Sequence, residues 1–315
     1  MCIVSIIITY LNEEECISDL CNFIDAYAIG KPYNLEVIFV DDGSTDNTTE
    51  KVTAYKFVNC KVVKLIKFSK NFGMHAAIRA GYQHATGDYC TYIGADLQEP
   101  ADMIDVMYEN IIKGYDAVYI EKNSIDAGVI NNMFSRTFAF FIRKYAVKNY
   151  GSGGTNNIMI NRKVLKYMNE NIEINSGLAL QLINAGFRST SVKMDYKKRI
   201  AGTTKWSFSN KLKLFIDSFV SFSSMPIRAV SSIGIIMALL GFIYGAYIII
   251  NRLINPDVPM TGFATLASLI LFSFGITNIS LGIIAEYLWR TYDAARGRPA
   301  FILSDVQILK DDNTK

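Results

Sequence analysis

Apolar runs of strand length alternate with helical patterns through the first half of the chain. Four runs have the continuous apolar, aromatic or β-branched character of buried strands: Ile3 to Thr9, Leu35 to Val40, Val62 to Phe68 and Tyr89 to Ile93. Helical patterns lie between them, for example up to about Tyr27 and from Ala76 to Thr86. This alternation predicts an α/β domain built on a doubly wound sheet with right-handed crossovers.

Three of these strands end in polar turns, which begin near Asn12, at Asp41 and at Asp96. In an open α/β sheet the carboxyl ends of the parallel strands meet at one edge, and ligands bind there. Gln98 follows Asp96 by two residues, so its amide oxygen would reach a metal ion held by the Asp96 carboxylate. The alternative is a helix N-cap aspartate without a metal, because Pro100 suits the first position of a helix. The spacing alone does not separate the two.

The C-terminal third carries two long apolar segments. Ala229 to Ile250 has 22 residues without a charge, and Val258 to Ala285 has 28. A helix over the first would be about 33 Å long, enough to cross a bilayer. We therefore predict two transmembrane helices; the alternative is a buried helical hairpin of a soluble protein.

The segment before the first span has helical amphipathic spacing. Its apolar positions fall on one stripe between Phe208 and Phe222, and Lys211 and Lys213 lie off that stripe. A basic amphipathic helix beside a membrane span predicts an interfacial helix. The alternative is an ordinary surface helix that packs on the preceding domain.

Basic residues flank the spans on both outer sides: Lys205, Lys211, Lys213 and Arg228 before the first, and Arg290, Arg296 and Arg298 after the second. The connecting loop holds Arg252 and Asp257. By the positive-inside rule both ends of the chain lie in the cytoplasm and the loop lies outside.

Net charge, a missing glycine motif and cysteine spacing argue against several classes of function. The net charge of +3 is too small to indicate nucleic-acid binding. The first strand is not followed by G-x-G-x-x-G, which argues against a dinucleotide fold. The 5 cysteines contain no C-x-x-C pair, as expected for reduced cytosolic thiols rather than for disulfides or zinc.

Several motifs, in order, resemble one enzyme family. Ser5 to Glu13 and Val40 to Asp46 resemble the nucleotide-binding half of family 2 glycosyltransferases. Further motifs resemble the polyprenyl-phosphate branch of that family: Lys70-Asn71-Phe72-Gly73, Ala80-Gly81, Thr86-Gly87-Asp88, Ala95-Asp96-Leu97-Gln98-Glu99-Pro100, and Arg199 with Gly202 to Ser207. Ser221 to Arg228, the two spans and Gly297-Arg298-Pro299 are similar to bactoprenol glucosyltransferases.

The resemblance implies a GT-A (Rossmann-like) fold and the inverting transfer of one hexose from a nucleotide-sugar, most commonly UDP-glucose, to polyprenyl (undecaprenyl) phosphate. It implies that Asp96 and Gln98 hold Mg²⁺ or Mn²⁺ and that Arg199 and Lys205 meet phosphate oxygens, so that Asp96, Arg199 and Lys205 are the catalytic residues. The implied donor-binding residues are Thr9, Leu11, Glu13, Asp41, Asp42, Gly73, Asp96 and Gln98. A hard divalent cation with oxygen ligands suits a diphosphate leaving group.

Three positions depart from the family pattern. Gly94 stands where the family usually has the first Asp of Asp-x-Asp, and Asn156 stands where it tends to carry Asp. An arginine expected after the fourth strand is replaced by Glu121-Lys122. These departures keep a degenerate, non-catalytic membrane scaffold open as an alternative. A processive polysaccharide synthase is a second alternative, although the chain lacks its Q-x-x-R-W motif and its additional spans.

We therefore expect a multi-pass protein of the inner (cytoplasmic) membrane with its catalytic domain in the cytoplasm. The expected parts are a GT-A domain over 1–207, an amphipathic juxtamembrane segment over 208–228, transmembrane helices over 229–251 and 262–289, and a cytoplasmic tail over 290–315. Gly241 and Gly245 form a G-x-x-x-G pair, which permits a homo-oligomer or packing between the two spans of one chain.

Overall fold

The computed structural model describes residues 2–122, 140, 143–144, 157–173, 177–196, 223, 225–254 and 262–312. The chain divides into two compact units, one formed by Met1–Ser218 with Pro299–Lys315 and the other by Phe219–Arg298. The C-terminal residues therefore belong to the same unit as the N-terminal domain.

The first unit alternates strands and helices. In chain order its described elements are β1 (Ile3–Tyr10), α1 (Ile17–Tyr27), β2 (Asn34–Asp41), α2 (Thr48–Ala54), β3 (Val62–Phe68), α3 (Met74–His84), β4 (Tyr89–Gly94), α4 (Met103–Ile111), β5 (Ala117–Lys122), β6 (Ile158–Asn161), α6 (Arg162–Glu170), α7 (Leu178–Asn184), β7 (Ser189–Met194) and β8 (Leu303–Asp311). The four predicted core strands are all present within a residue or two of their expected bounds.

These strands form one mixed sheet in the order β7-β5-β6-β4-β1-β2-β3-β8. The central strands β4, β1, β2 and β3 are parallel, whereas β6 and β8 pair antiparallel to their neighbours. The α/β prediction is therefore confirmed, with an antiparallel strand on each side of the parallel centre. A mixed sheet of this kind is common in large α/β folds.

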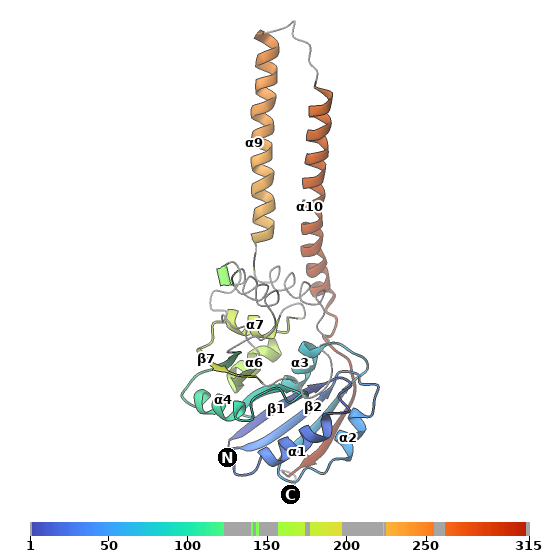
Figure 1. Cartoon of the computed structure of the whole chain (residues 1–315), viewed down its shortest axis with the longest axis vertical. Helices are drawn as coiled ribbons and strands as arrows, with labels where there is room; N and C mark the ends of the chain where they lie inside the picture. Colours follow the sequence, from blue (N-terminus) through green and yellow to red (C-terminus); the bar gives the residue numbers. More distant parts are fainter. Residues whose placement is uncertain are drawn as a thin grey trace. The chain divides into compact units, whose positions relative to one another are not determined.

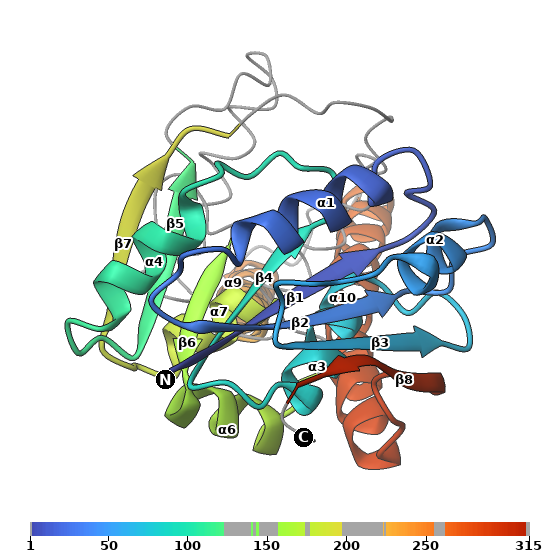
Figure 2. The same cartoon turned by 90° about the horizontal axis from the view of Figure 1, so that it is seen from below.

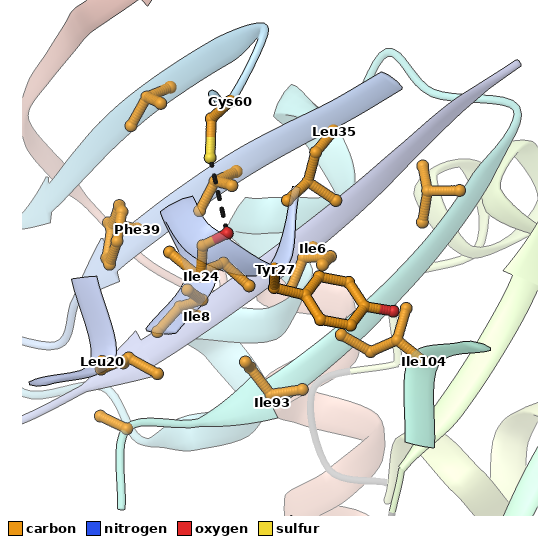
Figure 3. Close-up of a cluster of buried hydrophobic side chains, with 14 of the residues drawn as sticks. Ile6, Ile8, Leu20, Ile24, Tyr27, Leu35, Phe39, Cys60, Ile93 and Ile104 are labelled. Atoms are coloured by element: carbon orange, nitrogen blue, oxygen red, sulfur yellow. Dashed lines mark hydrogen bonds between the residues drawn. The ribbon is translucent and has the colours of Figure 1, made fainter. Parts of the chain in front are cut away.

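Helices cover both faces of the sheet, as Figure 2 shows. Side chains alternate along β1, so that Ile6 and Ile8 face one core and Ile7 faces the other. The first core packs under α1, α2 and α4, and Figure 3 shows part of it around Ile24 and Phe39. The second packs under α3, α6 and α7. There α3 lies so close to β1 that a Cβ at Gly81 would overlap the side chain of Ile7.

The C-terminal strand β8 is not predicted from the sequence, from which we expect only a tail over 290–315. β8 pairs antiparallel with β3 and extends the sheet by one strand. Phe301 stacks on Phe68 at a centroid distance of 5.2 Å, and the backbone N–H of Ser69 donates to the Ile302 carbonyl at 3.1 Å. The pairing is interrupted by two register shifts, between Val63 and Lys64 and between Lys67 and Phe68.

The second unit contains two long helices, α9 (Met225–Ile254) and α10 (Phe263–Arg296), drawn in Figure 1. Both are long and apolar enough to cross a membrane, over Met225–Asn251 and Ser268–Arg296, with mean hydropathy of 2.4 and 1.9. They agree with the two predicted spans, although each helix is longer than its predicted range. The Tyr287 hydroxyl donates to the Ser223 carbonyl at 2.9 Å, within this unit. The predicted amphipathic segment Phe208 to Phe222 lies outside the described residues.

Candidate functional site

The carboxyl ends of β4, β1 and β2 lie level at one edge of the sheet. Thr9 is in register with both Gly94 and Val40, and Tyr10 is in register with Asp41. The turns that follow these strands therefore start side by side. This confirms the prediction that the three polar strand ends open on one edge, where an α/β sheet binds its ligands.

The turns after β1 and β2 are joined to each other by reciprocal hydrogen bonds. The Asn12 N–H donates to the Ser44 hydroxyl at 3.1 Å, and the Asn12 amide oxygen accepts the Thr45 N–H at 2.8 Å. Asn12 adopts a left-handed backbone with φ 52°, a conformation that asparagine tolerates better than most residues. Next to it, the Glu13 N–H donates to the Thr48 hydroxyl at 3.0 Å. We call these two joined turns, residues 11–13 and 42–48, the double turn. It fixes the half-buried residues Leu11 and Glu13 at the edge of the sheet.

Asp41 and Asp42 use their carboxylates to hold neighbouring loops. Asp41 is fully buried and accepts the Ser44 N–H at 2.7 Å and the Thr49 hydroxyl at 2.6 Å. Asp42, which is 5% exposed, accepts the N–H of Phe72 at 2.7 Å and that of Gly73 at 3.0 Å. Burial raises the pKa of Asp42, and the charge of Asp41 raises it further. Their direct contact with a nucleotide, which the resemblance implies, stays a prediction.

Gly73 is held at the start of α3 by that contact with Asp42. Its φ of 94° lies in the region that side chains rarely adopt, so the turn requires glycine there. The loop from Lys70 to Gly73 therefore reaches the same edge as the strand ends. This places Gly73 with the other predicted donor-binding residues.

The turn after β4 is tight and carries Asp96 and Gln98. Leu97 has a left-handed φ of 51°, and the Gln98 N–H lies 3.4 Å from the Asp96 Oδ1 atom. The backbone thus folds back so that residues 96 and 98 are neighbours. At the base of the turn, the Glu99 Oε1 atom accepts the Gly94 N–H at 2.9 Å. Burial raises the pKa of Glu99, and the nearby charge of Asp96 adds to this.

The donor types at this turn fit a hard divalent cation. A carboxylate at Asp96 and an amide oxygen at Gln98 are ligands that Mg²⁺ and Mn²⁺ accept. Within the part of the chain that the structure describes, no group of three or more His, Cys, Asp and Glu side chains forms a closed metal site. Two protein ligands match the open kind of site that substrate phosphates complete.

The surroundings of Asp96 are acidic. Burial raises the pKa of the Cys16 thiol, and the negative charges of Glu13, Glu15, Asp19 and Asp96 raise it further. An anionic ligand would be repelled from this corner of the sheet edge without a cation to offset those charges. A divalent cation at Asp96 would offset them.

Two buried polar contacts behind the turn were not predicted from the sequence. Asn157, which is 4% exposed, donates through Nδ2 to the Tyr92 carbonyl at 2.7 Å, and its Oδ1 accepts the Tyr196 hydroxyl at 2.6 Å. These bonds join β4 and the residues beside β6 and β7 directly behind Gly94. The only sequence signal is the polar pair before the apolar run Ile158 to Ile160.

His75 and Arg79, on α3, are a second feature that the sequence did not indicate. Burial, together with the charge of Arg79, lowers the pKa of His75 to about 4, so the imidazole is neutral at physiological pH. Its Nδ1 atom is buried and has no hydrogen-bond partner among the residues that the structure describes. Arg79 donates to the Gln181 Oε1 atom at 3.2 Å and to the Glu173 carbonyl at 2.5 Å, which ties α3 to the segment around α7.

The structure brings eight predicted residues together at this edge: Thr9, Leu11, Glu13, Asp41, Asp42, Gly73, Asp96 and Gln98. The two predicted phosphate ligands, Arg199 and Lys205, lie outside the described residues, as does Asn156. The last described residue before Arg199 is Tyr196, which contacts Asn157 behind the acidic turn.

Comparison with solved structures agrees with this architecture. The crystal structure of glucosyl-3-phosphoglycerate synthase from Mycobacterium tuberculosis, in complex with Mn²⁺, UDP and phosphoglyceric acid, superposes with a TM-score of 0.51. The match covers 70% of this chain and 76% of that one at 14% sequence identity. It shows a shared GT-A fold.

Two family models and several relatives match the sequence itself. The putative glycosyltransferase CsbB of Bacillus subtilis (strain 168) is 31% identical over 89% of this chain and 84% of its own length. The prophage bactoprenol glucosyl transferase homolog of Escherichia coli (strain K12) is 31% identical over 96% and 99%. The model of the GtrB C-terminal hairpin matches residues 225–290, and the model of glycosyl transferase family 2 matches residues 5–175. The chain therefore belongs to glycosyl transferase family 2, with a GtrB-type hairpin of two long apolar helices at its C-terminal end.

Proposed function

We propose that this chain is an inverting membrane glycosyltransferase that moves one hexose from a nucleotide-sugar to polyprenyl phosphate. UDP-glucose is the donor that we assign, and undecaprenyl phosphate is the acceptor. The observation that carries the proposal is the combination in one chain of the acidic turn at Asp96, on a GT-A sheet edge, with a GtrB hairpin. Relatives of the same length are named for bactoprenol glucosyl transfer.

Asp96 and Gln98 are the residues that would hold Mg²⁺ or Mn²⁺ at the donor diphosphate. A divalent cation bound there supplies charge stabilisation for the nucleoside diphosphate as it leaves. The chain itself supplies the geometry, because the left-handed turn at Leu97 and the hydrogen bond from Gly94 to Glu99 fix the two ligands relative to β4. The double turn around Asn12 and the loop held by Asp42 line the rest of the donor pocket.

A lipid phosphate needs little activation as an acceptor. Its oxygen is already anionic near neutral pH, whereas a sugar hydroxyl must lose a proton as it attacks. The chain then has to position the acceptor and to offset the charges of two phosphate-bearing substrates. By their match to the family's phosphate-binding loop, Arg199 and Lys205 take this part. A reaction of this kind also tolerates Asn156 in place of an acid.

The membrane topology that we propose places the sheet domain and the C-terminal strand on the cytoplasmic side. β8 pairs with β3 in one sheet, so the chain that leaves the domain before α9 returns to the same domain after α10. Such a path requires an even number of membrane crossings, and two helices supply it. The basic residues that flank both helices favour the cytoplasm for that side. Gly241 and Gly245 meet no described atom within 4 Å of a built Cβ, and we assign them to contact with a second copy.

The proposal is tested by incubating the detergent-purified full chain with a panel of nucleotide-sugars and undecaprenyl phosphate. We expect a single lipid-linked sugar from one donor, dependent on Mg²⁺ or Mn²⁺. Growth of a polysaccharide would support the processive synthase. The absence of any transfer, with lipid and donor both bound, would support the non-catalytic scaffold.

A further inference from the structure

We infer that Glu99 supplies the second carboxylate of the cation site, in place of the acid that the family pattern puts at position 94. This inference rests on the proposed function, since it concerns the same cation at the donor diphosphate. It assigns a role to a residue outside the usual Asp-x-Asp spacing, and it explains why this chain carries glycine at the first position of that motif.

The space around Gly94 favours Glu99 as the second carboxylate. A Cβ built on Gly94 would lie 3.5 Å from the Glu99 Oε1 atom and 3.2 Å from the Asp96 Oδ1 atom. The Glu99 carboxylate therefore reaches the place where a side chain at position 94 would begin. An acid at 94 and an acid at 99 would each add a negative charge beside Asp96, which already carries one. Glycine at 94 and glutamate at 99 are thus complementary.

Glu99 is held in this place by hydrogen bonds to one of its two carboxylate oxygens. Oε1 accepts the Gly94 N–H at 2.9 Å and lies 3.5 Å from Asn157 Nδ2. Asn157 is itself fixed by the Tyr92 carbonyl and by the Tyr196 hydroxyl. Among the residues that the structure describes, the hydrogen bonds from Gly94 and Asn157 both reach Oε1, and we assign Oε2 to the cation.

The charge needed at the turn favours the same assignment. A divalent cation at Asp96 and Gln98 alone would have one formal negative charge from the protein at this turn. Hard cations are held more tightly as the number of charged oxygen ligands around them rises. Glu99 brings the protein charge at the turn to the value that an Asp-x-Asp motif provides, without a side chain at position 94.

The test is the affinity for Mn²⁺ in the presence of UDP, read from the electron paramagnetic resonance signal of free Mn²⁺ with the detergent-purified full chain. Glu99→Gln keeps the acceptor for the Gly94 N–H and removes the charge. We expect it to weaken Mn²⁺ binding about tenfold or more, the scale for loss of a group that supports a metal site. Glu109→Gln, the same change at an exposed position of α4, is the matched control and should leave the affinity unchanged.

The double variant Gly94→Asp with Glu99→Gln separates a cation role from a structural one. It moves the acid back to the family position, so we expect Mn²⁺ affinity to return to within about threefold of the wild type, on a scale where removal of a supporting group costs at least tenfold. A Glu99 that only braced the turn would not be replaced by an acid at 94. Melting temperature and UDP binding without metal should stay close to wild type in Glu99→Gln.

Each outcome decides a different claim. Unchanged Mn²⁺ affinity in Glu99→Gln, together with loss of binding in Asp96→Asn, overturns the inference and leaves the proposed function standing. Weak binding in Glu99→Gln that the double variant does not restore also overturns it. If the wild type itself binds no Mn²⁺ with UDP, the inference fails together with the cation part of the proposed function. Formation of the lipid-linked sugar, measured separately, still tests the transfer.

Discussion

Asp42 offers a sharp test of how the donor pocket is shaped. Its carboxylate is 5% exposed and accepts the backbone N–H groups of Phe72 and Gly73. Asp42→Ala removes both acceptors at once. Asp42→Asn keeps the Oδ1 position, which already lies 2.7 Å from the Phe72 nitrogen and 3.1 Å from the Gly73 nitrogen, and removes only the charge.

The expected magnitudes differ between the two variants. A buried N–H group left without an acceptor costs about 1–3 kcal/mol. The loop is half-buried, so we take about 1 kcal/mol for each of its two N–H groups, or about 2 kcal/mol in total. Local opening of the loop should then be about 30-fold more frequent in Asp42→Ala, since tenfold corresponds to about 1.4 kcal/mol. Because burial raises the pKa of Asp42, its charge adds no stability, and we expect less than about a threefold change in Asp42→Asn.

Amide hydrogen exchange at Phe72 and Gly73 in the full chain measures this opening directly. Exchange at Val40, in the buried strand β2, is the internal control and should not change. Binding of UDP to Asp42→Asn then isolates the charge: if the carboxylate lines the ribose pocket, affinity falls about tenfold without faster exchange, the loss of one charged hydrogen bond. Unchanged exchange at Phe72 and Gly73 in Asp42→Ala would refute the reasoning that Asp42 holds this loop.

Three other predictions concern catalysis, pH and topology. Arg199→Ala and Lys205→Ala should each lower the initial rate of lipid-linked product about 100-fold or more, the scale for loss of one charge-stabilising donor; near-normal rates would remove them from the site. Burial lowers the pKa of His75 from 6.5 to about 4, so the unfolded chain takes up a proton at a higher pH than the folded chain does. Protonation therefore favours unfolding as the pH falls from 6.5 towards 4. Wild-type stability should drop by up to about 3 kcal/mol more than that of His75→Gln between pH 7 and pH 4.5, and equal pH profiles of the melting temperature would contradict this. In a cysteine-free background, a cysteine at Asn255 should react with a membrane-impermeant thiol reagent in intact cells and one at Asn313 should not; the reverse labelling would overturn the orientation.

The sequence predicts the centre of the sheet well because its strands are buried on both faces. A continuous apolar run such as Ile3 to Thr9 is typical of a strand that is buried on both faces of a parallel sheet. Polar turns at the ends of such strands mark the edge where ligands bind. Eight of the predicted donor and metal residues consequently fall at one edge of the structure. The polar turns that reveal these residues in the sequence also bring them together in space, because the strands before them end in register.

The parts that the sequence does not predict depend on long-range contacts. β8 has an irregular pattern, and it becomes a strand because β3 offers an unpaired edge more than 200 residues earlier in the chain. Asn157 and Tyr196 come together only because β6 and β7 lie on either side of β5. The role of Glu99 depends on the space over Gly94, which a missing aspartate in a motif does not reveal.

The measurement that tests the central claim most directly is the mass of the lipid product made by the purified full chain from a nucleotide-hexose and undecaprenyl phosphate. The proposed function predicts undecaprenyl monophosphate carrying one hexose, released by mild acid and absent when Asp96 is changed to asparagine. A product with the hexose on a sugar hydroxyl, or with a chain of several sugars on one acceptor, would contradict the claim that this enzyme transfers a single sugar to a lipid phosphate.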